Sequence, residues 1–204
     1  ADHGQPEVPG HLHERGIAGA HYFDVDGLDK APAIEALKKR FGVGEELIEA
    51  FFQPYVYLNR EVIEARGLDP ALVESAVAAE LEKFPGVAAA VSSTALRRAR
   101  LPDTRLMRAI RQNFHPRRSG DIYLVFEPNV FINDFDGLSV SSVHGSPWRY
   151  DTFVPLLFAG AGLAPRKVSR PVTPYDVAPT LAAFLGIKPP SGAVGDPLPE
   201  VLGE

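Results

Sequence analysis

The chain has 204 residues, 45% of them apolar and 9% aromatic, so it is long enough to bury one sizeable core. A net charge of −5 with interspersed acids and bases lacks the basic stripe that nucleic-acid binding requires, and no apolar stretch approaches the roughly 20 residues of a membrane-spanning helix. Cysteine is absent, which excludes disulfides and thiolate metal sites, so any transition metal must be bound by His and carboxylate groups.

The first part of the chain reads as short strands and helices. Residues 19–26 have strand character and end in an Asp-Gly turn signal. A helix is expected over residues 31–41, with Pro32 in its first turn. Residues 45–52 are predicted to form a second short helical stretch, and residues 55–58 alternate as a strand.

The middle of the chain predicts two helices around a strand. Asp69 as N-cap and Pro70 at the first helical position start a helix that runs to about residue 84. Its apolar face is predicted to consist of Leu72, Val73, Val77 and Leu81. Residues 87–91 read as a strand, and Asp103 is expected to cap a helix that extends to about residue 113. The arginines of this region are expected to form a solvated helix face.

The last third begins with a strand at residues 121–126. Residues 154–158 form a continuous apolar run, which predicts a strand buried on both faces. A helix beginning at Thr173-Pro174 is predicted to end at Gly186, with an apolar side formed by Val177, Leu181, Phe184 and Leu185. The tail after it is rich in Pro and Gly and is expected to wrap the surface. Alternating helices and strands favour an α/β layer fold.

Two places carry candidate metal ligands. Asp2-His3 sets a hard carboxylate beside an imidazole, which suits Zn²⁺, and Gly4 permits the tight backbone of such a turn. An Asp-His-Gly tripeptide alone is more often an ordinary turn. His144 lies in a Gly- and Ser-rich loop ahead of the apolar run, and ligands of open α/β sheets gather at loops around strand ends.

The other candidates favour ordinary roles. His11 and His13 are separated by one residue and are expected in an exposed loop, while His21 and His115 are expected to be structural. The acids of the 134–136 segment lack the spacing of a calcium loop and are interpreted as loop acids: Asp134 and Asp136.

Several segments, in order, resemble landmarks of one branch of the alkaline phosphatase superfamily, the type I phosphodiesterase/nucleotide pyrophosphatase (PafA-like phosphatase) branch. They are Asp2-His3-Gly4, residues 114–121 (FHPRRSGD), residues 144–151 (HGSPWRYD), residues 170–181 and residues 186–192. The resemblance covers most of the chain, and the blocks at His144 and Asp176 are the specific ones. It implies the C-terminal part of an alkaline-phosphatase-like sheet flanked by helices, with a smaller α/β lobe inserted.

The resemblance also implies a division into three parts. Residues 1–30 would be the metal-site turn and the start of the core, residues 31–113 the smaller α/β lobe, and residues 114–204 the C-terminal part of the core. In that family two zinc ions flank a Thr or Ser nucleophile. Asp2 and His3 would bind the zinc that contacts the nucleophile, and His144 would bind the other zinc.

The nucleophile and the remaining ligands lie, in relatives, upstream of the Asp-His-Gly turn, so no nucleophile is named and more sequence is expected upstream. The parent enzyme is expected to be a phosphomonoesterase or phosphodiesterase acting on a phosphate ester, and this chain alone is expected to be inactive. Association through uncovered apolar sheet surface, or as a homo-oligomer, is also expected. Localisation is open, and the resemblance and the lack of Cys favour the periplasm or secretion.

Two alternatives stay open at this point. The chain could be a non-catalytic α/β module for binding or assembly. It could also belong to a sulfatase or phosphonate hydrolase of the same superfamily, because the residues that separate these activities surround the nucleophile.

Overall fold

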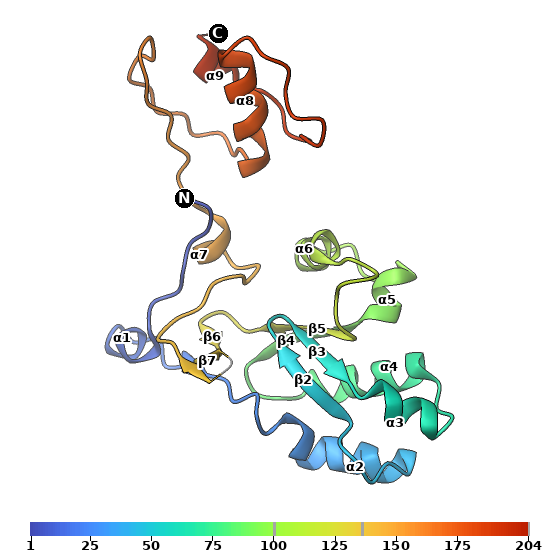
Figure 1. Ribbon diagram of the computed structural model, residues 1–204. Coiled ribbons are helices and arrows are strands. Elements are labelled where there is room, and N and C mark those ends of the chain that lie inside the picture. Colours follow the sequence, from blue (N-terminus) through green and yellow to red (C-terminus); the bar gives the residue numbers. More distant parts are fainter. Residues whose placement is uncertain (100, 136, 204) are drawn as a thin grey trace. The chain divides into compact units, whose positions relative to one another are not determined.

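The computed structural model describes residues 1–99, 101–135 and 137–203 (Figure 1). Internal contacts divide the chain into two compact units, one of residues 3–153 and one of residues 1–2 with 154 onward. Each unit is described by itself. The three-part division implied by the resemblance stays a prediction. Arg100 and Asp136, which belong to the predicted arginine face and the predicted loop acids, lie outside the described residues. Within the described chain, no helix has the length and apolarity to cross a membrane.

A four-stranded antiparallel sheet organises the larger unit, in the order β2-β3-β5-β4. Its strands are β2 (Ile48–Phe52), β3 (Tyr55–Leu58), β4 (Val87–Ser92) and β5 (Ile122–Phe126). The strands predicted over residues 55–58, 87–91 and 121–126 are therefore confirmed. Together with the helices on its faces, the sheet gives the predicted α/β class.

The helix predicted over residues 45–52 is wrong, because this segment forms strand β2. β2 and β3 make a hairpin joined by Gln53 and Pro54, with Phe52 opposite Tyr55. Asp29 determines where β2 begins, since its Oδ1 accepts the backbone N–H groups of Leu47 at 2.8 Å and Ile48 at 2.7 Å. A carboxylate from a distant turn thus takes up amides that local sequence patterns would assign to a helix.

Helices cover both faces of the sheet (Figure 1). One face packs on α2 (Pro32–Phe41), α3 (Arg60–Ala65) and α4 (Pro70–Leu81). The other packs on α5 (Ser93–Arg97) and α6 (Arg105–Asn113). β5 serves both, because side chains alternate along a strand: Ile122, Leu124 and Phe126 enter the first core, and Tyr123 and Val125 enter the second.

The predicted helix starts and stops are largely confirmed. α2 has Pro32 in its first turn and ends at Gly42, whose φ of 67° is left-handed. At the start of α4 the Asp69 side chain accepts the N–H of Ala71 at 2.9 Å. The apolar face of α4 was wrong at Leu72, which is 50% exposed because it lies one position, about 100° of helix, from the buried Val73.

The cap predicted for α6 was also wrong. Thr104, not Asp103, caps this helix, and its Oγ1 accepts the N–H of Met107 at 3.2 Å. Asp103 instead lies 3.5 Å from the Arg108 guanidinium. The described arginines of α5 and α6 are exposed, as predicted: Arg97, Arg98, Arg105, Arg108 and Arg111.

Short elements complete the larger unit: α1 (Pro9–Glu14), η1 (Leu28–Lys30), α7 (Arg149–Thr152), and the strands β1 (His21–Tyr22), β6 (Val130–Phe131), β7 (Asp134–Phe135) and β8 (Leu138–Ser139). β1 pairs in parallel with β6, and β7 pairs with β8. The strand character predicted over residues 19–26 is thus realised at two residues. The predicted loop around His11 and His13 is a short helix, with Pro9 in its first turn.

The smaller unit contains η2 (Pro174–Asp176), α8 (Val177–Phe184) and α9 (Pro199–Leu202). The strand predicted over residues 154–158 is wrong. This run pairs with no strand among the described residues, and Leu157 is 86% exposed. Its apolar composition is typical of a sheet interior, but the described chain offers it no ladder partner.

The helix predicted after Thr173 is confirmed, and so is its end at Gly186, where φ is 66°. The apolar side predicted for this helix is largely exposed, at Leu181, Phe184 and Leu185, whereas Thr180 and Ala182 are buried. The tail covers that second face, because the N–H of Leu198 donates to Thr180 Oγ1 at 2.9 Å. The tail therefore wraps α8 as predicted and adds α9, which the sequence analysis missed.

Candidate functional site

Two imidazoles lie against each other in the larger unit. The rings of His3 and His144 stack with centroids 3.6 Å apart and an angle of 15° between their planes. His3 Nδ1 lies 2.8 Å from the Gly4 carbonyl oxygen, and because a carbonyl only accepts, Nδ1 carries the proton. The lone pair of His3 is then on Nε2, which is the tautomer seen in histidines that bind a metal through Nε2.

Gly4 fixes the place of His3 because no other residue fits there. The Gly4 N–H donates to the carbonyl oxygen of Asp151 in α7 at 2.8 Å. A Cβ atom on Gly4 would lie 1.8 Å from the carbonyl oxygen of Tyr150, well inside the contact limit. The tight backbone predicted for the Asp-His-Gly turn is therefore a close approach to α7.

The loop that carries His144 is anchored on both sides. Gln53 Nε2, from the β2–β3 connection, donates to the His144 carbonyl oxygen at 3.0 Å. The Ser146 N–H donates to Asp151 Oδ2 at 2.7 Å. Gly145 between them has a φ of 100°, which favours glycine. Hydrogen bonds thus attach the loop to the β2–β3 connection on one side and to α7 on the other.

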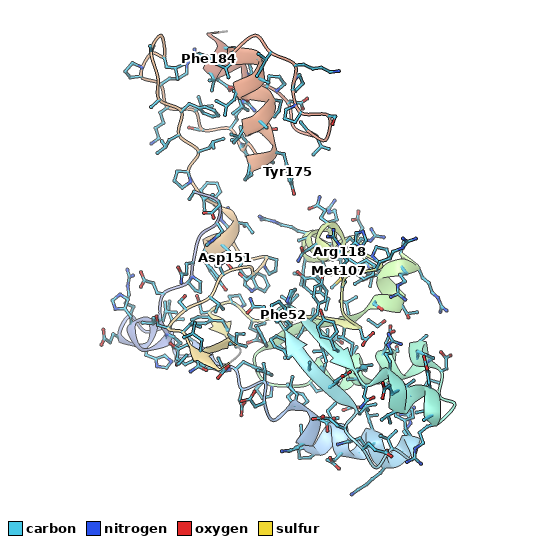
Figure 2. The ribbon with its side chains drawn as sticks, in the orientation of Figure 1. Phe52, Met107, Arg118, Asp151, Tyr175 and Phe184 are labelled. Atoms are coloured by element: carbon cyan, nitrogen blue, oxygen red, sulfur yellow. The ribbon has the colours of Figure 1, made fainter. Side chains whose placement is uncertain are left out.

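Asp151 is the most buried acid of this region, 4% exposed, and Figure 2 shows it on α7. Its Oδ1 and Gln53 Oε1 are buried, and neither has a hydrogen-bond partner among the described residues. Both side chains line a cavity of about 30 Å³ that reaches β5 and the His144 loop. Burial also raises the pKa of Tyr150, which lines the same cavity.

No protein-family model matches the chain. The chain is 34% identical over 208 residues to alkaline phosphatase PafA of Elizabethkingia meningoseptica, covering 100% of this chain and 36% of that protein. It is also 34% identical over 203 residues to a Myroides odoratus protein named calcium-transporting ATPase, covering 99% of this chain and 36% of that protein. The crystal structure of PafA superposes with a TM-score of 0.79 at 30% identity, over 100% of this chain and 37% of that one.

The chain is a homologue of the PafA-like alkaline phosphatases. Alkaline phosphatase PhoV of Synechococcus elongatus, 26% identical over 99% of this chain, is a further relative. The chain spans about a third of the length of the curated relatives that it matches. The predicted resemblance and the α/β fold class are thereby confirmed.

The structure brings together two of the three predicted metal ligands. His3 and His144 are brought together, as the stacked rings show. Asp2 is exposed and is grouped with residues 154 onward, so its role as a zinc ligand stays a prediction. Imidazole and carboxylate suit zinc, but the described residues hold no group of three His, Asp or Glu side chains able to bind a metal.

The other histidines have local contacts. His11 Nδ1 lies 3.5 Å from Glu14, and His13 Nε2 lies 2.6 Å from the Ala20 carbonyl oxygen. His21 Nδ1 lies 2.9 Å from the Gly19 carbonyl oxygen, and His115 Nδ1 accepts the N–H of Arg117 at 3.2 Å. Sequence reasoning missed Gln53 and Asp151. Asp151 ends the HGSPWRYD block and could have been found there, whereas nothing in the sequence around Gln53 indicates its contact with His144.

Proposed function

We propose that this chain supplies part of the active site of a phosphoric ester hydrolase, with a phosphate ester as substrate. The observation that carries the proposal is the stack of His3 on His144, because it joins two sequence blocks that resemble metal-ligand blocks of the family. The similarity to PafA over the whole chain supports the reaction class.

In this proposal Asp2 and His3 bind one zinc ion and His144 binds a second. The protonated Nδ1 of His3 supports a ligand role for Nε2, and the two anchors of the His144 loop hold its imidazole in place. A pair of zinc ions would lower the pKa of a hydroxyl nucleophile and neutralise charge that develops at phosphorus. The further ligands and the nucleophile come from the part of the phosphatase fold that lies beyond the matched third.

The test is a chimera in which this chain replaces the matching third of Elizabethkingia PafA. We expect two zinc ions per molecule and hydrolysis of p-nitrophenyl phosphate or bis-p-nitrophenyl phosphate by the chimera, and neither by the 204-residue chain alone. ATP is included as a substrate because the Myroides relative is named an ATPase. Intact PafA is the control for assay and metal loading.

The same chimera with His144→Ala provides the decisive comparison. We expect it to fold, to bind less zinc and to lose most of its activity, while His11→Ala, which changes an exposed imidazole of α1, leaves both unchanged. A folded, metal-free and inactive chimera would contradict the proposal and favour the non-catalytic binding module. Activity toward sulfate or phosphonate esters alone would show that the substrate is one of these and not a phosphate ester.

A further inference from the structure

The cavity beside the His144 loop contains two acceptors that no donor of the described chain reaches. Gln53 Oε1 and Asp151 Oδ1 are both buried and lack a hydrogen-bond partner among the described residues. Both side chains line the same cavity of about 30 Å³. A site of roughly 10–15 Å³ holds one water molecule, so this cavity has room for about two.

The side chains around the cavity leave both oxygens without a donor. Ser146, Tyr150, Tyr123 and His144 line it together with apolar residues such as Leu124 and Phe126, but among the described residues none of them donates to Gln53 Oε1 or Asp151 Oδ1, and no Lys or Arg lines the cavity. The nearby Ser146 N–H is already bound to Asp151 Oδ2. Buried carboxylates and amides in folded proteins are hydrogen-bonded, paired with charge, or bound to a cation or ordered water.

Flipping the Gln53 side-chain amide, so that its oxygen and nitrogen trade places, does not account for the unpaired oxygen. The Nε2 group donates to the His144 carbonyl oxygen at 3.0 Å, and a carbonyl oxygen in its place could make no hydrogen bond there. The present orientation therefore keeps Oε1 as an acceptor. Two acceptors in one cavity call for a ligand that gives hydrogen bonds or positive charge.

We propose that this cavity is a binding site for a small ligand that donates to both oxygens, namely one or two water molecules or a monovalent cation. The ligand bridges Gln53 of the β2–β3 connection and Asp151 of α7. These are the two residues that hold the backbone of His144 and Ser146, so the bridge closes a ring around Gly145. The existence of the site does not depend on the proposed function. Only a role of the site in positioning His144 as a metal ligand rests on the proposed function.

Crystallography of the 204-residue chain gives the first test. A peak within hydrogen-bonding distance of Gln53 Oε1 and Asp151 Oδ1 supports the site. Crystals grown in thallium(I) salt separate the two sources of ligand, because an anomalous peak at that position identifies a monovalent cation and its absence identifies water. A cavity without density, or a direct hydrogen bond between the two side chains, would overturn the proposal.

Exchange of the Ser146 amide proton tests the bridge in solution. Gln53→Met removes one end of the bridge and also the donor to the His144 carbonyl oxygen, but it changes neither partner of the hydrogen bond from Ser146 to Asp151. We expect the Ser146 amide to exchange about two- to tenfold faster, the ratio expected for losing one net hydrogen bond. Gln5→Met, at an exposed position, is the matched control.

A further variant separates the bridge from the contact with His144. Gln53→Glu keeps an acceptor in the cavity but loses the donor to the His144 carbonyl oxygen. If a cation is bound, this variant gains thermal stability when tetramethylammonium chloride is replaced by sodium or potassium chloride at equal ionic strength. If water is bound, its stability is the same in the three salts. Unchanged Ser146 exchange in Gln53→Met would contradict the bridge in either case.

Discussion

Two polar clusters of the larger unit differ in how fully their groups are paired. In the first, Arg60 donates to Glu74 at 2.8 Å and also to Asp121, whose other oxygen accepts the N–H of Leu58 at 2.7 Å. Glu74 Oε2 accepts in addition from Ser93 and Thr94. In the second, around the His144 loop, Gln53 Oε1 and Asp151 Oδ1 are buried and have no hydrogen-bond partner among the described residues.

The difference separates a cluster that stabilises the fold from one that is arranged for a ligand. The two buried carboxylates of the first cluster are paired with the partly exposed Arg60 and with backbone N–H groups, so nothing further has to bind there. The second cluster holds stacked imidazoles and two buried acceptors for which the described part of the chain supplies no donor, an arrangement that folding alone does not require. The substitutions below disrupt the first cluster or the second, and their effects on stability test this difference.

Glu74→Ala should have the largest effect on stability. Glu74 is 1% exposed, and its removal leaves Arg60 and the backbone N–H of Thr94 without their buried partner. We expect the free energy of unfolding to fall by about 3 kcal/mol, measured by urea denaturation. Glu80→Ala on the same helix removes a largely surface pair with Lys83 and should change it by less than about 1 kcal/mol. Equal losses of stability in both variants would contradict the structural role of the Glu74 cluster.

Gly4→Ala should have the next largest effect, because its Cβ would lie 1.8 Å from the Tyr150 carbonyl oxygen. The turn has to move away from α7, which should destabilise the protein by about 1–3 kcal/mol and separate the rings of His3 and His144. Thermal melting measures the first effect, and the ring resonances of the two histidines measure the second. Gly10→Ala is the control, since a Cβ there meets nothing within 4 Å.

His144→Ala should alter stability by less than Gly4→Ala does, because the imidazole is exposed and contributes mainly its stacking on His3. A loss of about 0.5–1.5 kcal/mol is expected in urea denaturation. A loss as large as that of Glu74→Ala would show that His144 belongs to the structural network and not to a ligand site.

The smallest effect is expected at Glu200 in the smaller unit. Hydrogen bonds from the Arg170 guanidinium lower the pKa of this exposed carboxyl from its ordinary value of 4.5 to about 2. A lowered folded-state pKa stabilises the protein above pH 4.5, and that contribution is lost as the pH falls from about 4.5 to about 2. Arg170→Met should return the pKa of Glu200 toward 4.5 in a carboxyl NMR titration. A value that stays near 2 would contradict this cause.

Local signals predicted the elements whose boundaries are made locally. Pro32 and Gly42 delimit α2, and Asp69-Pro70 starts α4, because caps act within a few residues of the chain. β2 was missed because its first amides bind Asp29, which is distant in sequence. The strand predicted over residues 154–158 was wrong for a related reason: a strand needs a partner, and its own composition cannot provide one.

The candidate site was predicted in part. The blocks containing His3 and His144 indicated two imidazoles that lie together, and these are stacked in the structure. Gln53 could not have been predicted, because its contact with His144 depends on the β2–β3 hairpin, whose first strand was predicted to be helical. The unpaired oxygens of Gln53 and Asp151 are a property of tertiary packing and have no sequence pattern.

Strand β5 has a consequence for insertions and deletions. Its odd and even residues belong to different cores, with Tyr123 and Val125 on the α5–α6 side and Ile122, Leu124 and Phe126 on the other. A slip by one residue would exchange the two sets, sending Tyr123 and its hydroxyl into the core on the α2–α4 side and Phe126 out of it. A single-residue deletion in β5 should therefore damage both cores at once, whereas a two-residue change would keep each set on its own side.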